Sequence, residues 1–211
     1  TFIVLMCLSM SFLGQEKQAS AQRYLKKNAD LLKVNEQDLD GLVLSSISPA
    51  GKGTYDIAYL QQTKGGINIH NRVANVVFNK SGSPVDFRGA LANNLERTNI
   101  ATSPSVSVES GLESAAKHLN LGPLGDITII EPGIGADQNG ILSKGNISQS
   151  DITFRLVYQD FGKAGIKLAW EYVIHENSGQ HWWQIRVDAL TGAYIDKNDW
   201  VVECNVDHGF G

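Results

Sequence analysis

The feature that most limits the fold is a stretch near the C-terminal end, residues 152–200, in which apolar and polar side chains alternate in three long segments and a shorter fourth. A period of two places the apolar side chains of each segment on one face of a β-sheet. Glycine-bearing linkers separate the segments, and such linkers favour hairpins between antiparallel strands. The stretch therefore predicts an antiparallel meander with one apolar and one wet face. The apolar positions are Ile152, Phe154, Leu156 and Tyr158, then Leu168, Trp170, Tyr172 and Ile174, then Trp183, Ile185 and Val187.

The N-terminal end carries a different pattern, an apolar block over residues 2–13. The block is too short to cross a bilayer comfortably, so it predicts no stable membrane span. It fits the hydrophobic region of a secretory signal peptide, and residues 19–21, Ala-Ser-Ala, fit its cleavage site. We therefore expect a signal peptide over residues 1–21, a mature N-terminus at Gln22 and a secreted protein. A buried core segment is the alternative.

Composition narrows the possible functions. The chain has 211 residues with a formal net charge of -4 and no long run of like charge, which gives no indication of nucleic-acid binding. Removal of a signal peptide would take Cys7 with it and leave Cys204 alone, so no internal disulfide is expected. Cys204 and His208 supply too few ligands for a zinc site. We expect no metal, no cofactor and no catalytic residues in this chain.

The pattern along the chain predicts two halves, each with a helix followed by strands. The N-terminal half, residues 22–92, starts with a helix over 22–33, and a polar linker follows over 93–107. The C-terminal half, residues 108–203, starts with a helix that Ser107 can cap. Residues 133–145 are rich in glycine and predict a loop or loose hairpin, and we expect residues 204–211 to begin a connection to a further domain.

A weak internal repeat links the halves. Residues 78–85 align with residues 187–194, and both segments place Asn or Asp where a turn begins and Gly near its end. If one helix packs on each sheet, it buries one face of that sheet. The expected fold class is α+β, with two halves made of one helix and an antiparallel meander each.

Parts of both halves resemble a known family. Residues 66–85, GINIHNRVANVVFNKSGSPV, resemble the fungalysin/thermolysin propeptide (FTP) motif, which has a glycine-led strand, a second strand, a glycine turn and a return strand. Residues 168–174 and 182–194 resemble the PepSY-like region that follows it, and residues 196–200 are similar to the end of a fungalysin-type prosegment. The resemblance covers most of the mature chain and implies cystatin- or PepSY-like meanders.

The resemblance implies a prosegment and not an enzyme. Such a prosegment precedes a zinc metallopeptidase domain, assists its folding and covers its active site as an intramolecular inhibitor until it is cut away. The family's peptidase carries His-Glu-x-x-His on a helix, where a step of four places two imidazoles toward zinc. This chain has His175 and Glu176 but no second His, and the segment lies at an expected hairpin. We therefore expect the catalytic domain, with its zinc, downstream of this chain.

Three residues are candidates for the contact with that peptidase domain: Trp182, Arg186 and Trp200. Alternation places Trp182 with Arg186 on the wetter face, and Trp beside Arg is common at interfaces. The alternative for Trp182 is packing under a loop. Trp183, Trp170 and Tyr172 are predicted to be core. The rival hypothesis for the whole chain is a free-standing secreted binding or inhibitor module with the same kind of sheet and no attached enzyme.

Overall fold

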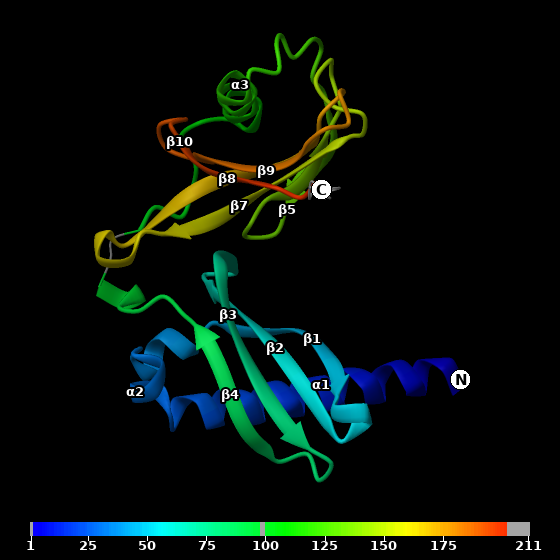
Figure 1. Cartoon of the computed structure of the whole chain (residues 1–211), viewed down its shortest axis with the longest axis vertical. Coiled ribbons are helices and arrows are strands. Elements are labelled where there is room, and N and C mark those ends of the chain that lie inside the picture. Colours follow the sequence, from blue (N-terminus) through cyan, green and yellow to red (C-terminus); the bar gives the residue numbers. More distant parts are fainter. Residues whose placement is uncertain (1, 98–99, 202–211) are drawn as a thin grey trace, which may run out of the picture. The chain divides into compact units, whose positions relative to one another are not determined.

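The protein is an α+β molecule that divides into two compact units. The computed structural model describes the backbone of residues 2–97 and 100–201, and the side chains of residues 14–96 and 100–201. Unit 1 comprises residues 1–100 and the hairpin tip Tyr158–Lys167, and unit 2 comprises Ala101–Val157 and Leu168–Gly211. Each unit combines a helix with an antiparallel sheet, which confirms the predicted fold class (Figure 1).

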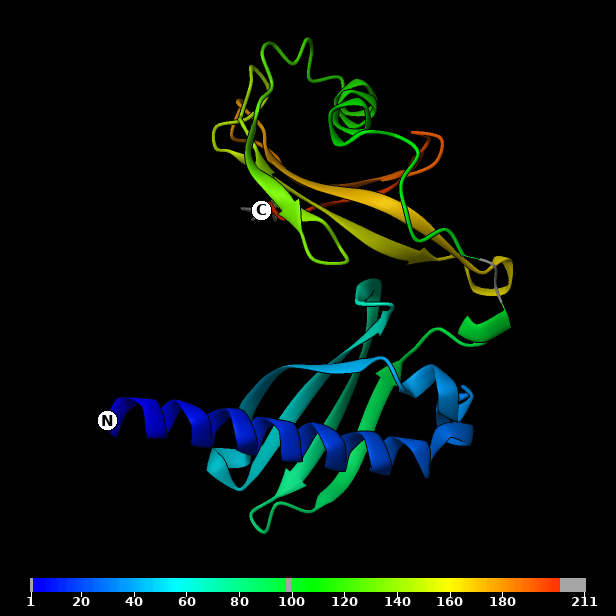
Figure 2. The same cartoon turned by 180° about the vertical axis from the view of Figure 1, so that it is seen from behind.

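In unit 1, one long helix lies across a face of a sheet with the order β1-β2-β3-β4 (Figure 2). The core between them consists of small and medium apolar side chains, including Ala21, Leu25, Leu60 and Phe78. The elements of the unit are α1 (Phe2–Lys26), α2 (Ala29–Leu32), η1 (Glu36–Leu39), β1 (Leu42–Ala50), η2 (Gly51–Gly53), β2 (Tyr55–Lys64), β3 (Ile67–Asn79), β4 (Pro84–Ala90) and η3 (Leu95–Arg97).

Helix α1 is joined to the sheet by polar bonds as well as by its apolar side. The side-chain amide of Gln22 donates to the backbone carbonyl of Leu42 at 2.8 Å, and the amide oxygen of Gln18 accepts from the backbone N–H of Leu44 at 3.1 Å. Lys17 pairs with Asp56 on β2. The two glutamine bonds satisfy backbone groups on β1, which is an edge strand of the unit 1 sheet.

The helix boundaries predicted for this region are wrong. We expected a helix over residues 22–33, but α1 ends at Lys26 and the short α2 follows after a break at residues 27–28. The expected cleavage point after Ala21 lies inside α1, where the Ala21 side chain is fully buried. The signal peptide stays a prediction. Among the helices of the described part of the chain, none is long and apolar enough to cross a membrane.

In unit 2, helix α3 (Val108–Leu119) packs on a sheet with the order β5-β6-β7-β8-β9-β10. The segment predicted as a glycine-rich loop or loose hairpin contributes to a paired hairpin, β5 with β6. The strands are β5 (Ile129–Ile134), β6 (Asn139–Leu142), β7 (Ile152–Asp160), β8 (Ile166–His175), β9 (Trp182–Asp188) and β10 (Tyr194–Asp199), and η4 (Gly162–Ala164) lies between β7 and β8.

The start of α3 is fastened to β8 by two aromatic side chains. Trp170 Nε1 donates to the carbonyl of Val106 at 2.8 Å, and the Tyr172 hydroxyl donates to the carbonyl of Val108 at 2.7 Å. Both aromatic residues are core, as predicted. Burial, with a smaller contribution from the Glu109 carboxylate, raises the pKa of Tyr172 well above its ordinary value. Tyr172 therefore remains a hydrogen-bond donor at any physiological pH.

The last hairpin of each unit is built on the same turn chemistry. Asn79 Oδ1 accepts from the backbone N–H groups of Ser81 and Ser83 at 3.1 and 3.0 Å between β3 and β4. Between β9 and β10, Asp188 Oδ1 accepts from the N–H groups of Leu190 and Thr191 at 2.9 and 3.1 Å. Each turn then contains a glycine of positive φ, Gly82 at 77° and Gly192 at 74°. The predicted turns are confirmed. The duplication itself stays a prediction.

Candidate functional site: a charged row and a polar pocket in unit 2

A row of alternating charges crosses four strands of unit 2. Glu171 on β8 pairs directly with Arg186 on β9, and Arg186 pairs with Asp196 on β10. Since Glu171 lies between Trp170 and Tyr172 on its strand, the row lies on the sheet face turned away from α3. We call Arg155, Glu171, Arg186 and Asp196 the charge row.

The charges of the row are joined by short contacts. Arg155 Nε lies 2.8 Å from Glu171 Oε1, and Arg186 Nη1 lies 3.2 Å from Glu171 Oε2. Arg186 Nη2 lies 2.9 Å from Asp196 Oδ2. The two inner members are buried, with side-chain exposures of 2% for Glu171 and 0% for Arg186, whereas Arg155 and Asp196 are 39% and 50% exposed. Two arginines thus neutralise a carboxylate that is buried with one of them.

The exposure predicted for Arg186 is therefore wrong. Alternation correctly assigned its side chain to the face away from α3, but the surrounding structure buries that part of the face. The guanidinium group is held by two carboxylates of its own unit. Arg186 is a buried member of the charge row and not an exposed neighbour of Trp182.

Trp182 and Trp200 are exposed, as a contact surface requires. Their side chains are 42% and 48% exposed, and the ring centroids lie 5.6 Å apart. His175 stacks on the other side of Trp182 at 5.1 Å, and Trp200 N donates to the Trp182 carbonyl at 2.9 Å. We call Trp182 and Trp200 the tryptophan pair. No contact of the pair with a partner is tested, so its interface role stays a prediction.

The opposite face at this end of the sheet carries Trp183. Its ring is partly exposed, whereas a fully buried ring was predicted. His181 stacks on it with 4.5 Å between the centroids, and Lys197 Nζ lies 4.5 Å from its centroid. Its Nε1 donates to Glu176 at 3.0 Å. The ring is thus enclosed by polar side chains instead of by α3.

Asp199 ties the end of β10 to the start of β9. Its carboxylate accepts from the backbone N–H groups of Trp182 and Val201, both at 3.0 Å, and lies 2.6 Å from His181 Nδ1. Burial alone would raise the pKa of Asp199, but the hydrogen bonds from His181 and the two N–H groups outweigh it, so the net pKa is lowered. The ionised carboxylate is therefore the form that holds the tryptophan pair in place.

Beside the charge row lies a pocket of about 270 Å³, which we call the polar pocket. Residues from five strands or strand ends line it, so its walls belong to the sheet itself. Among the lining residues are Asn139, Thr153, Arg155, Glu171, Gln184 and Trp200.

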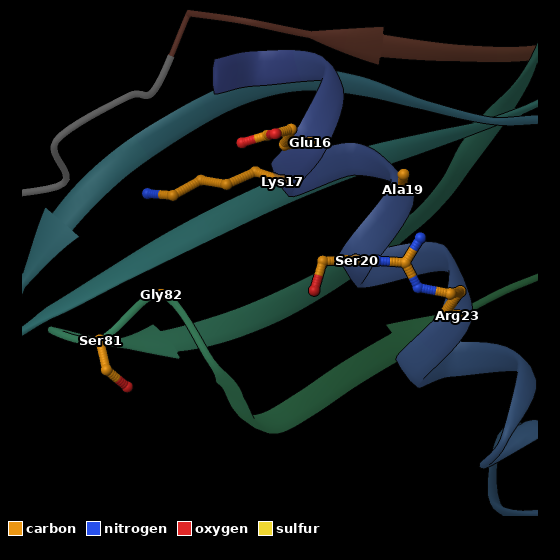
Figure 3. A pocket seen from close by; sticks show the side chains of 7 residues that line it. All are labelled: Glu16, Lys17, Ala19, Ser20, Arg23, Ser81 and Gly82. Atoms are coloured by element: carbon orange, nitrogen blue, oxygen red, sulfur yellow. The ribbon is translucent and has the colours of Figure 1, made fainter. Parts of the chain in front are cut away.

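A larger concavity, of about 600 Å³, lies in unit 1 between α1 and the β3–β4 turn. Lys17, Arg23 and Ser81 are among its lining residues, but Figure 3 shows that these side chains point in different directions. Lys17 is also engaged by Asp56. Its groups do not converge on one point, so the polar pocket of unit 2 is the better candidate site.

The remaining site predictions fall in two groups. His175 ends β8 and Glu176 follows it at the hairpin, as expected, which is not a helical zinc motif. Cys204 and His208 lie outside the described residues. In the part of the chain that the structure describes, no group of three or more His, Cys, Asp or Glu residues could hold a metal ion.

The charge row and the polar pocket were not predicted from the sequence, although the alternation of residues contained part of the information. Alternation places Arg155, Glu171 and Arg186 on one face of their strands. It does not give the register between strands, and the register is what brings the charges opposite one another.

Comparison with known proteins gives little to identify the chain. No family model matches it, and no curated protein matches it. Among solved structures, the Bacillus megaterium YpeB C-terminal domain matches over 88% of this chain, with 13% sequence identity and a TM-score of 0.35. The chain spans 64% of the length of that structure. A similarity of this degree assigns neither a ligand nor an activity.

Proposed function

We propose that this chain is a protein-binding module that acts as the prosegment of a secreted zinc metallopeptidase. In this role it inhibits the peptidase domain and assists its folding, and the zinc belongs to that domain. The resemblance of residues 66–85, 168–174 and 182–194 to FTP and PepSY-like prosegments supports the assignment to this class.

The single observation that carries the proposal is the tryptophan pair. Two large indole rings lie side by side, about half exposed, at one end of the unit 2 sheet. Tryptophan is the residue type most enriched among those that dominate binding energy at protein interfaces. Asp199 fixes the backbone of Trp182, so little conformational entropy would be lost on docking.

Covalent linkage would make modest contacts sufficient. A tethered module meets its partner at an effective concentration of roughly millimolar, so weak docking keeps the active site covered until the link is cut. Trp200 comes directly after β10, in the segment whose sequence resembles the end of a prosegment, and Trp182 begins the neighbouring strand β9.

The reading frame beyond Gly211 gives the first test. The proposal expects a domain with His-Glu-x-x-His and a further glutamate ligand. A stop codon directly after Gly211 would overturn the prosegment assignment and favour the free-standing binding module.

The second test is inhibition in trans. The peptidase domain is produced separately, and hydrolysis of a peptide substrate is measured while the 211-residue chain is added. The chain is expected to inhibit, and Trp182→Ala with Trp200→Ala should raise the inhibition constant by about 30-fold or more, the effect of losing a typical interface hot spot. Leu31→Ala, which removes a 73% exposed side chain in unit 1, is the matched control and should inhibit like the wild type. Absence of inhibition at high concentration would contradict the proposal.

A further inference from the structure

Several polar side chains in the walls of the polar pocket have donors or acceptors that form no hydrogen bond within the described part of the chain. Thr153 and Asn139 are exposed, and within the described part of the chain neither the Thr153 hydroxyl nor the Asn139 side-chain amide has a hydrogen-bond partner in the protein. Gln184 uses only its amide oxygen, which accepts from Asn198 at 3.2 Å. Its NH₂ group has no partner within the described chain. The pocket thus presents a neutral hydroxyl, a neutral amide and one further pair of donors.

The charged groups of the pocket are already neutralised. Arg155 is bound by Glu171 through Nε and Nη2, at 2.8 and 2.7 Å, and Glu171 is also bound by Arg186. A ligand that carries a net charge would have to compete with these pairs, because the buried carboxylate cannot lose a partner without a large cost. The arrangement therefore favours an uncharged ligand rich in hydrogen-bonding groups.

Trp200 adds a flat apolar wall to these polar groups. Its side chain is 48% exposed and lines the pocket, and the centroid of the Trp182 ring lies 5.6 Å from its own. The face of an indole ring is electron-rich and attracts groups with positively polarised hydrogens. The C–H face of a sugar ring is such a group, while the hydroxyls at its rim are uncharged donors and acceptors.

Size gives an upper limit to the ligand. Pockets for drug-sized molecules span about 300 to 1,000 Å³, and the polar pocket, at about 270 Å³, lies just below this range. It is large enough for one or two sugar rings and too small for a longer chain to be enclosed.

We propose that the polar pocket binds a neutral saccharide, with one sugar ring against Trp200 and its hydroxyls bonded by Thr153, Gln184 and Asn139. The inference does not depend on the prosegment role. It concerns the isolated chain, and the residues proposed to form hydrogen bonds with the sugar are not members of the tryptophan pair.

The test uses four probes on the full chain: glucose, N-acetylglucosamine, and the β-1,4-linked disaccharide of each. Saturation-transfer NMR and tryptophan fluorescence are recorded up to about 50 mM probe, since a small solvent-exposed pocket binds weakly. At least one probe should give a saturable fluorescence change and NMR transfer to its ring C–H protons. Sorbitol, which has the hydroxyls but no ring, should give neither.

Two variants show whether the signal comes from this pocket. Trp200→Ala should weaken binding about tenfold, the loss expected for a stacked aromatic contact. Thr153→Val keeps the β-branched shape on β7 and should weaken binding about fivefold by removing one hydroxyl. Leu31→Ala, an exposed position in unit 1, should change binding by less than twofold. The proposal is overturned if no probe binds saturably, or if binding is the same in Trp200→Ala and Thr153→Val as in the wild type.

The result is distinguishable from that of the inhibition test. Thr153→Val should weaken saccharide binding while leaving inhibition of the peptidase domain unchanged, and inhibition by the wild-type chain should be the same with and without saturating saccharide probe. Each proposal can therefore fail while the other holds.

Discussion

Gly111 of α3 faces the hydroxyl group of Tyr172 so closely that a methyl group at position 111 would overlap the hydroxyl oxygen. The same methyl group would lie 3.1 Å from Trp170 Cδ1. The backbone of α3 therefore lies directly against the side chains of Trp170 and Tyr172, which also form hydrogen bonds to the start of the helix. A glycine in a helix costs roughly 1 kcal/mol relative to alanine, and here the close approach requires it.

Gly111→Ala should lower the free energy of unfolding of unit 2 by about 1 to 3 kcal/mol, because overpacking outweighs the gain in helix propensity. Urea denaturation followed by tryptophan fluorescence measures this, since all four tryptophans lie in unit 2. Tyr172→Phe should cost about 1 kcal/mol through the lost bond to Val108. The double variant should be less destabilised than the sum, because removing the hydroxyl makes room for the methyl group. Strict additivity would contradict the predicted contact. Lys117→Ala on the exposed side of α3 is the control.

Glu171→Gln should destabilise unit 2 by about 3 to 5 kcal/mol. The substitution keeps the volume but removes the charge that two arginines share, and the buried Arg186 would then keep only the ion pair with Asp196 of the two described for it above. Denaturant unfolding, again followed by tryptophan fluorescence, gives the value. Glu113→Gln changes an exposed carboxylate of α3 and should fall within about 0.5 kcal/mol of the wild type. Equal effects of the two substitutions would show that the charge row adds nothing to stability.

Asp38→Ala should loosen the segment that leaves unit 1. The Asp38 carboxylate is 1% exposed and accepts from the backbone N–H groups of Asn35, Asn94 and Leu95 at 3.0, 2.9 and 2.8 Å. Losing a charged acceptor of buried N–H groups should cost about 2 to 3 kcal/mol in unit 1. Hydrogen exchange measured by mass spectrometry should show faster exchange at residues 92–96.

The control for this experiment is Asp30→Ala, which changes an exposed carboxylate near the same region. It should leave exchange at residues 92–96 unchanged. Slow exchange at these residues in the Asp38 variant would disprove the role given to this carboxylate.

Acid should weaken the end of the unit 2 sheet through Asp199. Its pKa is lower in the folded state than in the unfolded state, so its contribution to stability is present above the unfolded value of about 3.8 and is lost as the pH falls through the folded value. Asp199→Asn should therefore destabilise the protein at pH 7, and the difference from the wild type should shrink below about pH 4. Unfolding free energies measured from pH 7 to pH 3 test this. Asp151→Asn, at an exposed position, should show no such trend, and a difference for Asp199→Asn that stayed constant with pH would refute the assignment.

The strands of unit 2 were predictable because their alternation is strong and their hairpins contain glycine. The core positions of Trp170 and Tyr172 followed from the same period of two, and the Asn and Asp turns followed from side chains that bond the backbone locally. These are all local properties of the sequence.

Features that depend on distant segments were not predictable. The prediction that Arg186 is exposed was wrong because alternation indicates on which face of the sheet a side chain lies and not what covers that face. The ring of Trp183 is only half buried because His181 and Lys197 lie over it in place of a helix. The boundaries of α1 were wrong because its apolar start has the pattern of a leader segment, and a helix pattern does not indicate where a leader would end.

Helix α1 also constrains the predicted cleavage after Ala21. A peptidase needs the bond that it cuts in an accessible, locally unfolded backbone, whereas the bond after Ala21 lies within a helix whose side chains contact β1 and β2. Removal of a leader at this bond would thus have to occur while the polypeptide is still unfolded. The shortened helix would then assemble on its sheet without the Lys17 and Gln18 contacts, so unit 1 would be less stable after this cleavage than before it.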